Sequence, residues 1–208
     1  MDLFSTLTLA LGSAWTSGVN LYATVAVLGL LQKFGAARLP GGLEVLDNWW
    51  IIGVAAALYL VEFVADKIPY VDSVWDAIHT FIRVPAGAIL ALSATTELDP
   101  TVQTLALLLG GGVALSSHGT KATARAFANL SPEPVSNWAL SLTEDVLAIG
   151  GVILAVFLPA VVAVLLVIFL ILFLWIAPKV ARKLLRMATA IRGFFVGENF
   201  RQVARKAA

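Results

Sequence analysis

Residues Glu62–Arg83 read EFVADKIPYVDSVWDAIHTFIR, the most ionisable run in an otherwise apolar chain. Glu62 and Asp66 are four residues apart, so a helix would place them on one face. After Pro69, four ionisable side chains recur at i, i+4, i+7 and i+11, which predicts a polar stripe along a second helix. These four are Asp72, Asp76, His79 and Arg83. Charges are costly inside a bilayer, so the sequence predicts partners or water for this stripe.

The composition of the whole chain indicates a polytopic membrane protein. Its 208 residues are 60% hydrophobic and only 13% charged, and the mean hydropathy is +0.91. Soluble domains carry nearer a quarter charged residues. The chain has no cysteine, which excludes disulfides, thiolate chemistry and cysteine-bound metals. We therefore predict an all-α polytopic membrane helix bundle, multi-pass in the plasma or inner membrane of the cell.

Basic residues are concentrated towards the C-terminal end of the sequence. Residues 179–208 hold eight of the fourteen Lys and Arg residues and one acid, Glu198. A basic stretch directly after a membrane span predicts a cytoplasmic location by the positive-inside rule. We expect residues 179–208 to form a basic amphipathic helix on the inner surface, attracted to anionic lipid headgroups. The aromatic or motif context of nucleic-acid binding is missing, so no nucleic-acid partner is expected.

Hydropathy predicts about six membrane segments in a single transmembrane domain at residues 1–178. The segments cover residues 3–34, 50–66, 74–94, 101–130, 137–157 and 160–177. The first segment, roughly 48 Å long as one helix, exceeds a hydrocarbon core of about 30 Å. Its middle, from Gly12 to Asn20, is rich in glycine and small polar residues. This composition favours close helix packing, a broken helix or a re-entrant hairpin.

The fourth segment carries a similar stretch, which indicates an internal duplication. Setting Gly12 on Gly110 also places Asn20 on His118, and each stretch precedes two apolar segments hinged at a proline. The repeats would cover about residues 3–94 and 101–178. Three crossings per repeat is an odd number, so the second repeat would be inverted, as in many transporters with a site at the repeat interface. We expect the first helix of each repeat to be broken or re-entrant.

The topology of the segments follows from the cytoplasmic C-terminus. With six full crossings, the N-terminus is also cytoplasmic and lies opposite the loop at residues 35–48. If the first and fourth segments are re-entrant instead, the loops at residues 35–48 and 95–100 both become cytoplasmic.

Four stretches of the sequence resemble a known family. They are GVNLYAT from Gly18, EFVADKIPYVDSVWDAIHTFIRVPAGA from Glu62, SHGTKATAR from Ser117 and SPEPVSNWALSLTEDV from Ser131. They are similar to the domain-of-unknown-function family numbered 4126, over roughly residues 5–190. The family consists of small integral membrane proteins without an assigned biochemical activity. The resemblance therefore implies a membrane architecture and adds little about chemistry.

Twelve polar or ionisable side chains are candidates for a site at the repeat interface. They are Asn20, Glu62, Asp66, Asp72, Asp76, His79, Arg83, His118, Lys121, Arg125, Glu144 and Asp145. Acids and bases would face each other there, either as structural ion pairs or as a polar path that binds an anion or relays protons. Lys121 and Arg125 share a helix face, so they could clamp a phosphate or carboxylate, or neutralise Glu144 and Asp145.

A metal or another cofactor is not expected at these residues. Asp66, Asp72, Asp76 and His79 are of the types that bind hard or borderline cations, but they form no compact ligand motif. Gly110–Gly112 is not a phosphate loop, because it lacks the lysine of that motif and follows no strand.

The sequence favours a small transporter or channel for a small solute, anionic or proton-coupled, with a polar path at the repeat interface. The alternative is a non-transporting membrane scaffold, assembly or lipid-organising factor. An enzyme acting on lipid headgroups through Asp72 and Asp76 is the weakest interpretation, because no catalytic motif is present. A transporter predicts a hydrated cavity lined by the stripe, and a scaffold predicts closed ion pairs. The lipid bilayer is the expected partner, and a homo-oligomer is compatible with the sequence.

Overall fold

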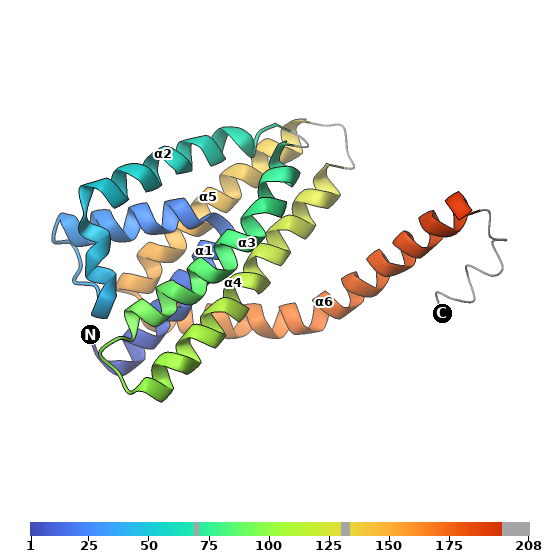
Figure 1. Cartoon of the computed structure of the whole chain (residues 1–208). Helices are drawn as coiled ribbons and strands as arrows, with labels where there is room; N and C mark the ends of the chain where they lie inside the picture. The colour runs from blue at the N-terminus through green and yellow to red at the C-terminus, as the bar shows by residue number, and fades with distance from the viewer. Residues whose placement is uncertain (69–70, 130–133, 197–208) are drawn as a thin grey trace. The chain divides into compact units, whose positions relative to one another are not determined.

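In the computed structural model, which describes residues 1–68, 71–129 and 134–196, every regular element is a helix. In chain order these are α1 (Leu3–Lys33), the 3₁₀ helix η1 (Gly41–Asp47), α2 (Trp49–Ala65), α3 (Val71–Ala94), α4 (Pro100–Ala128), α5 (Pro134–Phe157) and α6 (Pro159–Val196) (Figure 1). The predicted all-α bundle is confirmed. The chain divides into two compact units, Met1–Leu166 and Val167–Ala208. The predicted turn at Pro69 and the end of the basic tail lie outside the described residues.

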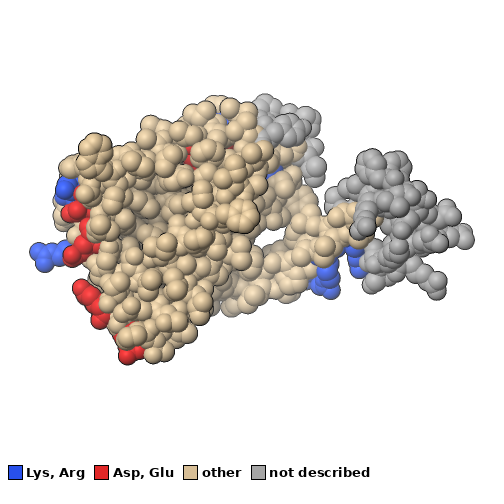
Figure 2. Space-filling model, in the orientation of Figure 1, with Lys and Arg blue, Asp and Glu red and all other residues tan. Residues whose placement is uncertain are grey.

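The helices have the length and the surface of membrane spans. Five helices of the described chain are long and apolar enough to cross a membrane, or six if η1 and α2, bent by 76°, count as one span. Large apolar side chains point outward, with exposed fractions of 84% for Trp50, 82% for Phe81 and 70% for Val146. In Figure 2 most of the acidic and basic side chains visible on the bundle gather at the end that carries the N-terminus. An apolar exterior suits contact with lipid, so these helices indicate a multi-pass membrane protein.

α1 consists of two half-helices that meet at Asn20. The backbone of Asn20 leaves the helical region, with a φ of −148° and a ψ of 101°. The Asn20 side chain then caps the second half-helix, because its Oδ1 accepts a hydrogen bond from the Ala23 N–H at 3.0 Å. The Thr24 hydroxyl also donates to the Asn20 carbonyl at 2.8 Å. The break is therefore a locally satisfied structure and not a gap in the hydrogen bonding of the helix.

The two half-helices fold back on each other as a hairpin. Both ends of α1 lie at one end of the bundle, where Met1 and Thr6 line a pocket together with Arg38 and Leu98 (Figure 1). Asn20, which is buried, lies deep between them. The break predicted in the first segment is confirmed, and the topology that places the N-terminus opposite the loop at residues 35–48 is wrong. Re-entrance of this hairpin into a membrane remains a prediction.

α4 is continuous, although the sequence predicts a break in it as well. The helix runs from Pro100 to Ala128 without a non-helical residue. Its Gly110 lies against α3, where an added Cβ would come 2.5 Å from the Cβ of Ala91. This glycine allows two helices to approach closely and does not end either of them. The expectation of a broken or re-entrant helix over residues 101–130 is wrong, and the inverted duplication remains a prediction.

α6 joins two elements that the sequence analysis separates. The apolar segment at residues 160–177 and the start of the basic segment form one helix of 38 residues that contains Pro178. Proline removes one backbone donor, and the helix continues past it. The Arg182 Nε donates to the Pro178 carbonyl at 3.1 Å.

The N-terminus of α4 gives a pH-dependent prediction. Asp99 caps this helix, because its Oδ1 accepts the Thr101 N–H at 2.8 Å. This backbone hydrogen bond lowers the pKa of the Asp99 carboxyl below its ordinary value. The cap therefore stabilises the fold at pH values above the unfolded pKa of about 4, and the contribution is lost as the pH falls through the lower folded pKa.

We expect Asp99→Ala to cause a small fall in the thermal unfolding midpoint near neutral pH, and a smaller difference from the wild type in acid. The exposed Glu97, two residues earlier, is the matched control, because Glu97→Ala removes the same charge without removing a cap. An equal effect of both substitutions at every pH would contradict the capping role.

Candidate functional site

All twelve candidate residues are buried in the unit Met1–Leu166. Their exposed fractions run from 0% for Glu62, Asp72 and Arg83 to 7% for Glu144 and Asp145. They come from five helices. Asn20 lies in α1, Glu62 and Asp66 lie at the C-terminal end of α2, and the others lie in α3, α4 and α5. Ion pairs and hydrogen bonds join nine of the twelve into one charge network between the helix break of α1 and the end of the bundle where α2 meets α3. Asn20 and Asp145 contact each other beside this network, and His79 binds Trp75 and Tyr22.

Arg83 of α3 connects the acids of α2 and α3. Its Nη2 donates to Glu62 Oε1 at 2.6 Å and its Nη1 to Asp76 Oδ1 at 3.0 Å. Asp76 lies seven residues before Arg83, two helical turns along the same face of α3. Two members of the predicted polar stripe therefore form an ion pair within one helix. The pair is buried, and Arg83 also binds Glu62 of the neighbouring helix α2.

Lys121 of α4 lies at the centre of the network. Its Nζ is 3.2 Å from Glu62 Oε1, 3.2 Å from Asp66 Oδ2 and 3.4 Å from Glu144 Oε2. The same Nζ donates to the Val19 carbonyl of α1 at 3.2 Å. One ammonium group therefore joins α1, α2, α4 and α5.

Arg125, one turn further along α4, fixes the end of α2 and the middle of α5. Its guanidinium contacts Glu144 at 2.5 Å and Asp66 Oδ2 at 3.2 Å. Its Nη1 also donates to the Asp66 carbonyl at 2.6 Å. Asp72 completes the group at 3.7 Å from Nη1. Planar bidentate pairing of this kind is specific to arginine.

The network contains more acid than base. Five carboxylates, on Glu62, Asp66, Asp72, Asp76 and Glu144, pair with three cations, on Arg83, Lys121 and Arg125, and a sixth, on Asp145, lies beside them without a salt bridge to a described residue. Four buried carboxylate oxygens have no hydrogen-bond partner among the described residues: Glu62 Oε2, Asp66 Oδ1, Asp76 Oδ2 and Asp145 Oδ2. Uncompensated buried charge is expensive. The described part of the bundle therefore holds an excess of buried negative charge.

At the break in α1, the C-terminal end of the first half-helix and the N-terminal end of the second half-helix both contact buried charged side chains. The first half-helix ends at Val19, whose carbonyl receives Lys121, so a cation meets the negative end of a helix dipole. The second half-helix begins after Asn20, whose Nδ2 donates to Asp145 Oδ1 at 3.3 Å. An anion thus lies beside the positive end of a helix dipole.

The two histidines have complete sets of partners. His79 Nδ1 lies 2.7 Å from the Trp75 carbonyl and its Nε2 lies 3.0 Å from the Tyr22 hydroxyl. His118 Nδ1 lies 3.1 Å from Arg83 Nη1 and its Nε2 lies 2.7 Å from the Thr80 hydroxyl. Each ring thus has one donor and one acceptor position in use, which fits a neutral imidazole.

The structure does not assemble the metal and anion sites considered in the sequence analysis. No group of three or more His, Asp or Glu side chains in the described part of the chain could hold a metal ion. Lys121 and Arg125 do not form an anion clamp, because carboxylates of the chain already occupy both. Lys121 and Arg125 instead neutralise Glu144, which is the other role that the sequence suggests for them. Asp145 forms a hydrogen bond with Asn20.

Several members of the network are missing from the sequence prediction. Asn129 Nδ2 donates to Asp72 at 3.1 Å, and Asn137 Nδ2 donates to Asn129 at 2.9 Å. Thr80 and Tyr22 bind the two histidines. A signal exists for two of them: Asn129 follows Arg125 by four residues and Thr80 follows Asp76 by four, so each shares a helix face with a charged residue.

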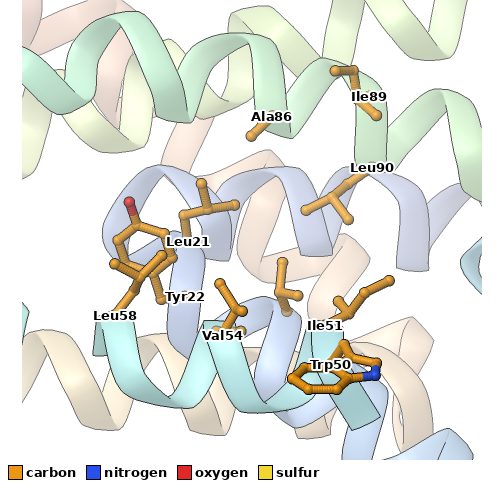
Figure 3. Close-up of a pocket in the computed structure, with 11 residues that line it drawn as sticks. Leu21, Tyr22, Trp50, Ile51, Val54, Leu58, Ala86, Ile89 and Leu90 are labelled. Carbon is orange, nitrogen blue, oxygen red and sulfur yellow. The ribbon is translucent and has the colours of Figure 1, made fainter. Parts of the chain in front are cut away.

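An apolar pocket of about 530 Å³ lies beside the network, between the second half of α1, α2 and α3. Figure 3 shows Trp50 and Tyr22 among its walls, with Leu58, Ala86 and Ile89. The Tyr22 hydroxyl reaches His79. The pocket is apolar, so it is not the hydrated cavity expected of a polar path.

The comparison with protein families agrees with this architecture. The family described as domain of unknown function (DUF4126) matches residues 7–179. The chain belongs to this family. The DUF4126 match includes every residue of the charge network and ends where the basic segment begins. No curated protein and no solved structure matches the chain.

Proposed function

We propose that this DUF4126 protein is a small membrane transporter or channel that moves protons, alone or with a solute, through the charge network. The observation that carries the proposal is the hairpin of α1, whose break at Asn20 places both free helix ends against buried charges. Interrupted and re-entrant helices at membrane depth line polar sites of transporters and channels. A bundle that only holds its own helices together needs no such break.

The balance of charge supports protons over anions. Even with Lys67 counted, four cations face six carboxylates, and a further anion would add to an existing excess of negative charge. Carboxylates and histidines arranged in chains are the usual carriers of protons in membrane proteins. The anionic solute considered from the sequence is therefore the less favoured substrate.

The closed ion pairs support a second candidate function. Arg83, Lys121 and Arg125 each contact two or more carboxylates. Such closure is the outcome that the sequence analysis expects of a scaffold or assembly factor whose charges serve only to hold the bundle. The two functions differ in whether protons cross the membrane.

Proton flux into liposomes tests the proposal. We expect liposomes that contain the full-length protein and a pH-sensitive dye to acidify under an inside-negative potassium diffusion potential, faster than protein-free liposomes. Asp76→Asn should reduce this flux, because it removes a carboxylate with an unpartnered buried oxygen. Glu97→Gln, at an exposed loop, is the matched control and should leave the flux unchanged. Wild-type flux equal to that of protein-free liposomes would overturn the proposal and favour the scaffold.

The cellular setting extends the proposal. The basic segment from residue 179 supports a cytoplasmic location for this part of the chain and contact with anionic headgroups in a plasma or inner membrane. Lys179 lies 3.2 Å from the centroid of the Trp175 ring, an arrangement common at membrane interfaces.

A further inference from the structure

We propose that Asp145 is the residue that binds and releases the proton, and that its charge controls the second half-helix of α1. This inference rests on the proposed function, because it names the proton-binding group of that same path.

Asp145 differs from the other five carboxylates in its partners. Each of the other five lies within 4.0 Å of at least one cation of the network. Asp145 has no salt bridge to a described residue. Its partners are neutral: the amide of Asn20 at 3.3 Å, and the hydroxyl of Tyr59 of α2, which interacts with the same carboxyl. Its Oδ2 is buried without a hydrogen-bond partner in the described chain. A carboxyl group in this position can accept a proton without breaking an ion pair.

Charged and titratable groups from the neighbouring elements face Asp145. α2 contributes Tyr59, Glu62 and Asp66, and α4 contributes Lys121. Lys67 comes from the turn after α2. The nearby acids favour a neutral Asp145 and the two lysines favour a charged one, so opposing interactions act on this carboxyl.

Lys67 connects this site with the end of the bundle. Its side chain is half-buried, and its Nζ donates to the Ser141 hydroxyl at 3.3 Å. Ser141 lies one helical turn before Asp145 on the same face of α5. A proton can therefore reach Asp145 from the end of the bundle that carries the turn, past Lys67 and Ser141.

The position of Asp145 at the helix break gives protonation a structural consequence. The charged carboxylate is attracted by Asn20 and by the positive end of the half-helix that Asn20 caps. A protonated Asp145 loses that attraction. The half-helix at residues 21–33 is then held less tightly to α5, and its displacement opens the path from the network towards the opposite end of the bundle.

The flux assay with Asp145 variants tests this assignment. We expect Asp145→Asn, which keeps a side chain of the same shape but cannot carry a charge, to reduce proton flux to the level of protein-free liposomes. Asp145→Glu keeps a titratable group and should retain part of the flux. Glu97→Gln is again the control. Wild-type flux that persists unchanged in Asp145→Asn would overturn the assignment and leave the proposed function standing, whereas absent wild-type flux would overturn the proposed function itself.

A labelling experiment gives a readout that is independent of flux. The chain contains no cysteine, so Val25→Cys places one thiol on the second half-helix. At one fixed alkaline pH, a membrane-permeant thiol reagent should react faster with Val25→Cys in the Asp145→Asn background than in the native background. Equal rates would contradict control of the half-helix by the charge of Asp145. Leu105→Cys, at an exposed position of α4, is the control and should react equally in both backgrounds.

Discussion

Replacing Arg125 by glutamine should lower the free energy of unfolding by about 3–5 kcal/mol, the usual cost of removing one partner from a buried ion pair. Arg125 is 1% exposed and contacts Glu144 and Asp66. Without it, Glu144 loses its closest cation and Asp72 loses the one cation that pairs with it among the described residues, in a part of the bundle that already has an excess of acid. At about 2–4 °C per kcal/mol, the thermal unfolding midpoint in detergent should fall by roughly 6–20 °C.

Two further variants distinguish the loss of the buried Arg125–Glu144 ion pair from the loss of one positive charge. Arg182→Gln removes an exposed arginine of α6 and should change the free energy of unfolding by no more than about 0.5 kcal/mol. Arg125→Gln combined with Glu144→Gln should be more stable than Arg125→Gln alone, because the second change removes a carboxylate that has lost its partner. An Arg125→Gln protein as stable as the wild type would show that the network contributes little to the fold.

The polar stripe of α3 is the part of the site that the sequence predicts well. Asp72, Asp76, His79 and Arg83 are all buried, at 0–3% exposure. Their spacing determines their common face on any helix, and the apolar residues between them, such as Phe81, point outward. The direction of the stripe follows because charges in a membrane bundle turn away from lipid.

The partners of these residues could not be predicted in the same way. Lys121 contacts Glu62 and Glu144 across 59 and 23 positions of the sequence, and no periodicity specifies which helices become neighbours. Most of the network therefore follows from packing. The excess of acid is visible as a count among the twelve candidate residues, but the lack of a salt bridge at Asp145 appears only once its neighbours are known.

α1 is broken and α4 is continuous, although the two helices have similar sequence patterns. Both helices carry glycines and small polar residues, and the sequence predicts a break in both. Asn20 can leave the helix because its side chain caps the new helix start at Ala23. His118 occupies the corresponding place in α4, but its ring binds Thr80 and Arg83, and the helix continues. Small residues indicate that two helices approach closely. A helix break also requires a residue, such as Asn20, whose side chain binds the backbone groups that the break leaves without a helical partner.

Gly18 of α1 illustrates how close that approach is, and Gly18→Val should largely prevent the hairpin from docking. An added Cβ at Gly18 would lie 2.0 Å from Ser117 Oγ and 2.4 Å from the Ala114 carbonyl oxygen. The Ala114 oxygen belongs to the backbone of α4, so α1 and α4 would have to separate. Overpacking by a methyl group alone costs about 1–3 kcal/mol, and valine adds two more carbons. We expect a marked loss of folded, monodisperse protein in detergent.

Matched glycine and serine variants test whether this loss comes from the contact with α4. Gly112→Ala adds the same methyl group as Gly18→Ala, at a position with no atom within 4 Å of the new Cβ, and should be tolerated. Ser117→Ala removes one of the two obstructing groups, but also the hydrogen bond from Ser117 Oγ to the Trp15 carbonyl at 2.8 Å. Combining it with Gly18→Ala should recover little stability, because the Ala114 carbonyl remains in place. Full recovery would mean that the Ser117 side chain, and not the approach of the two backbones, sets the distance between α1 and α4.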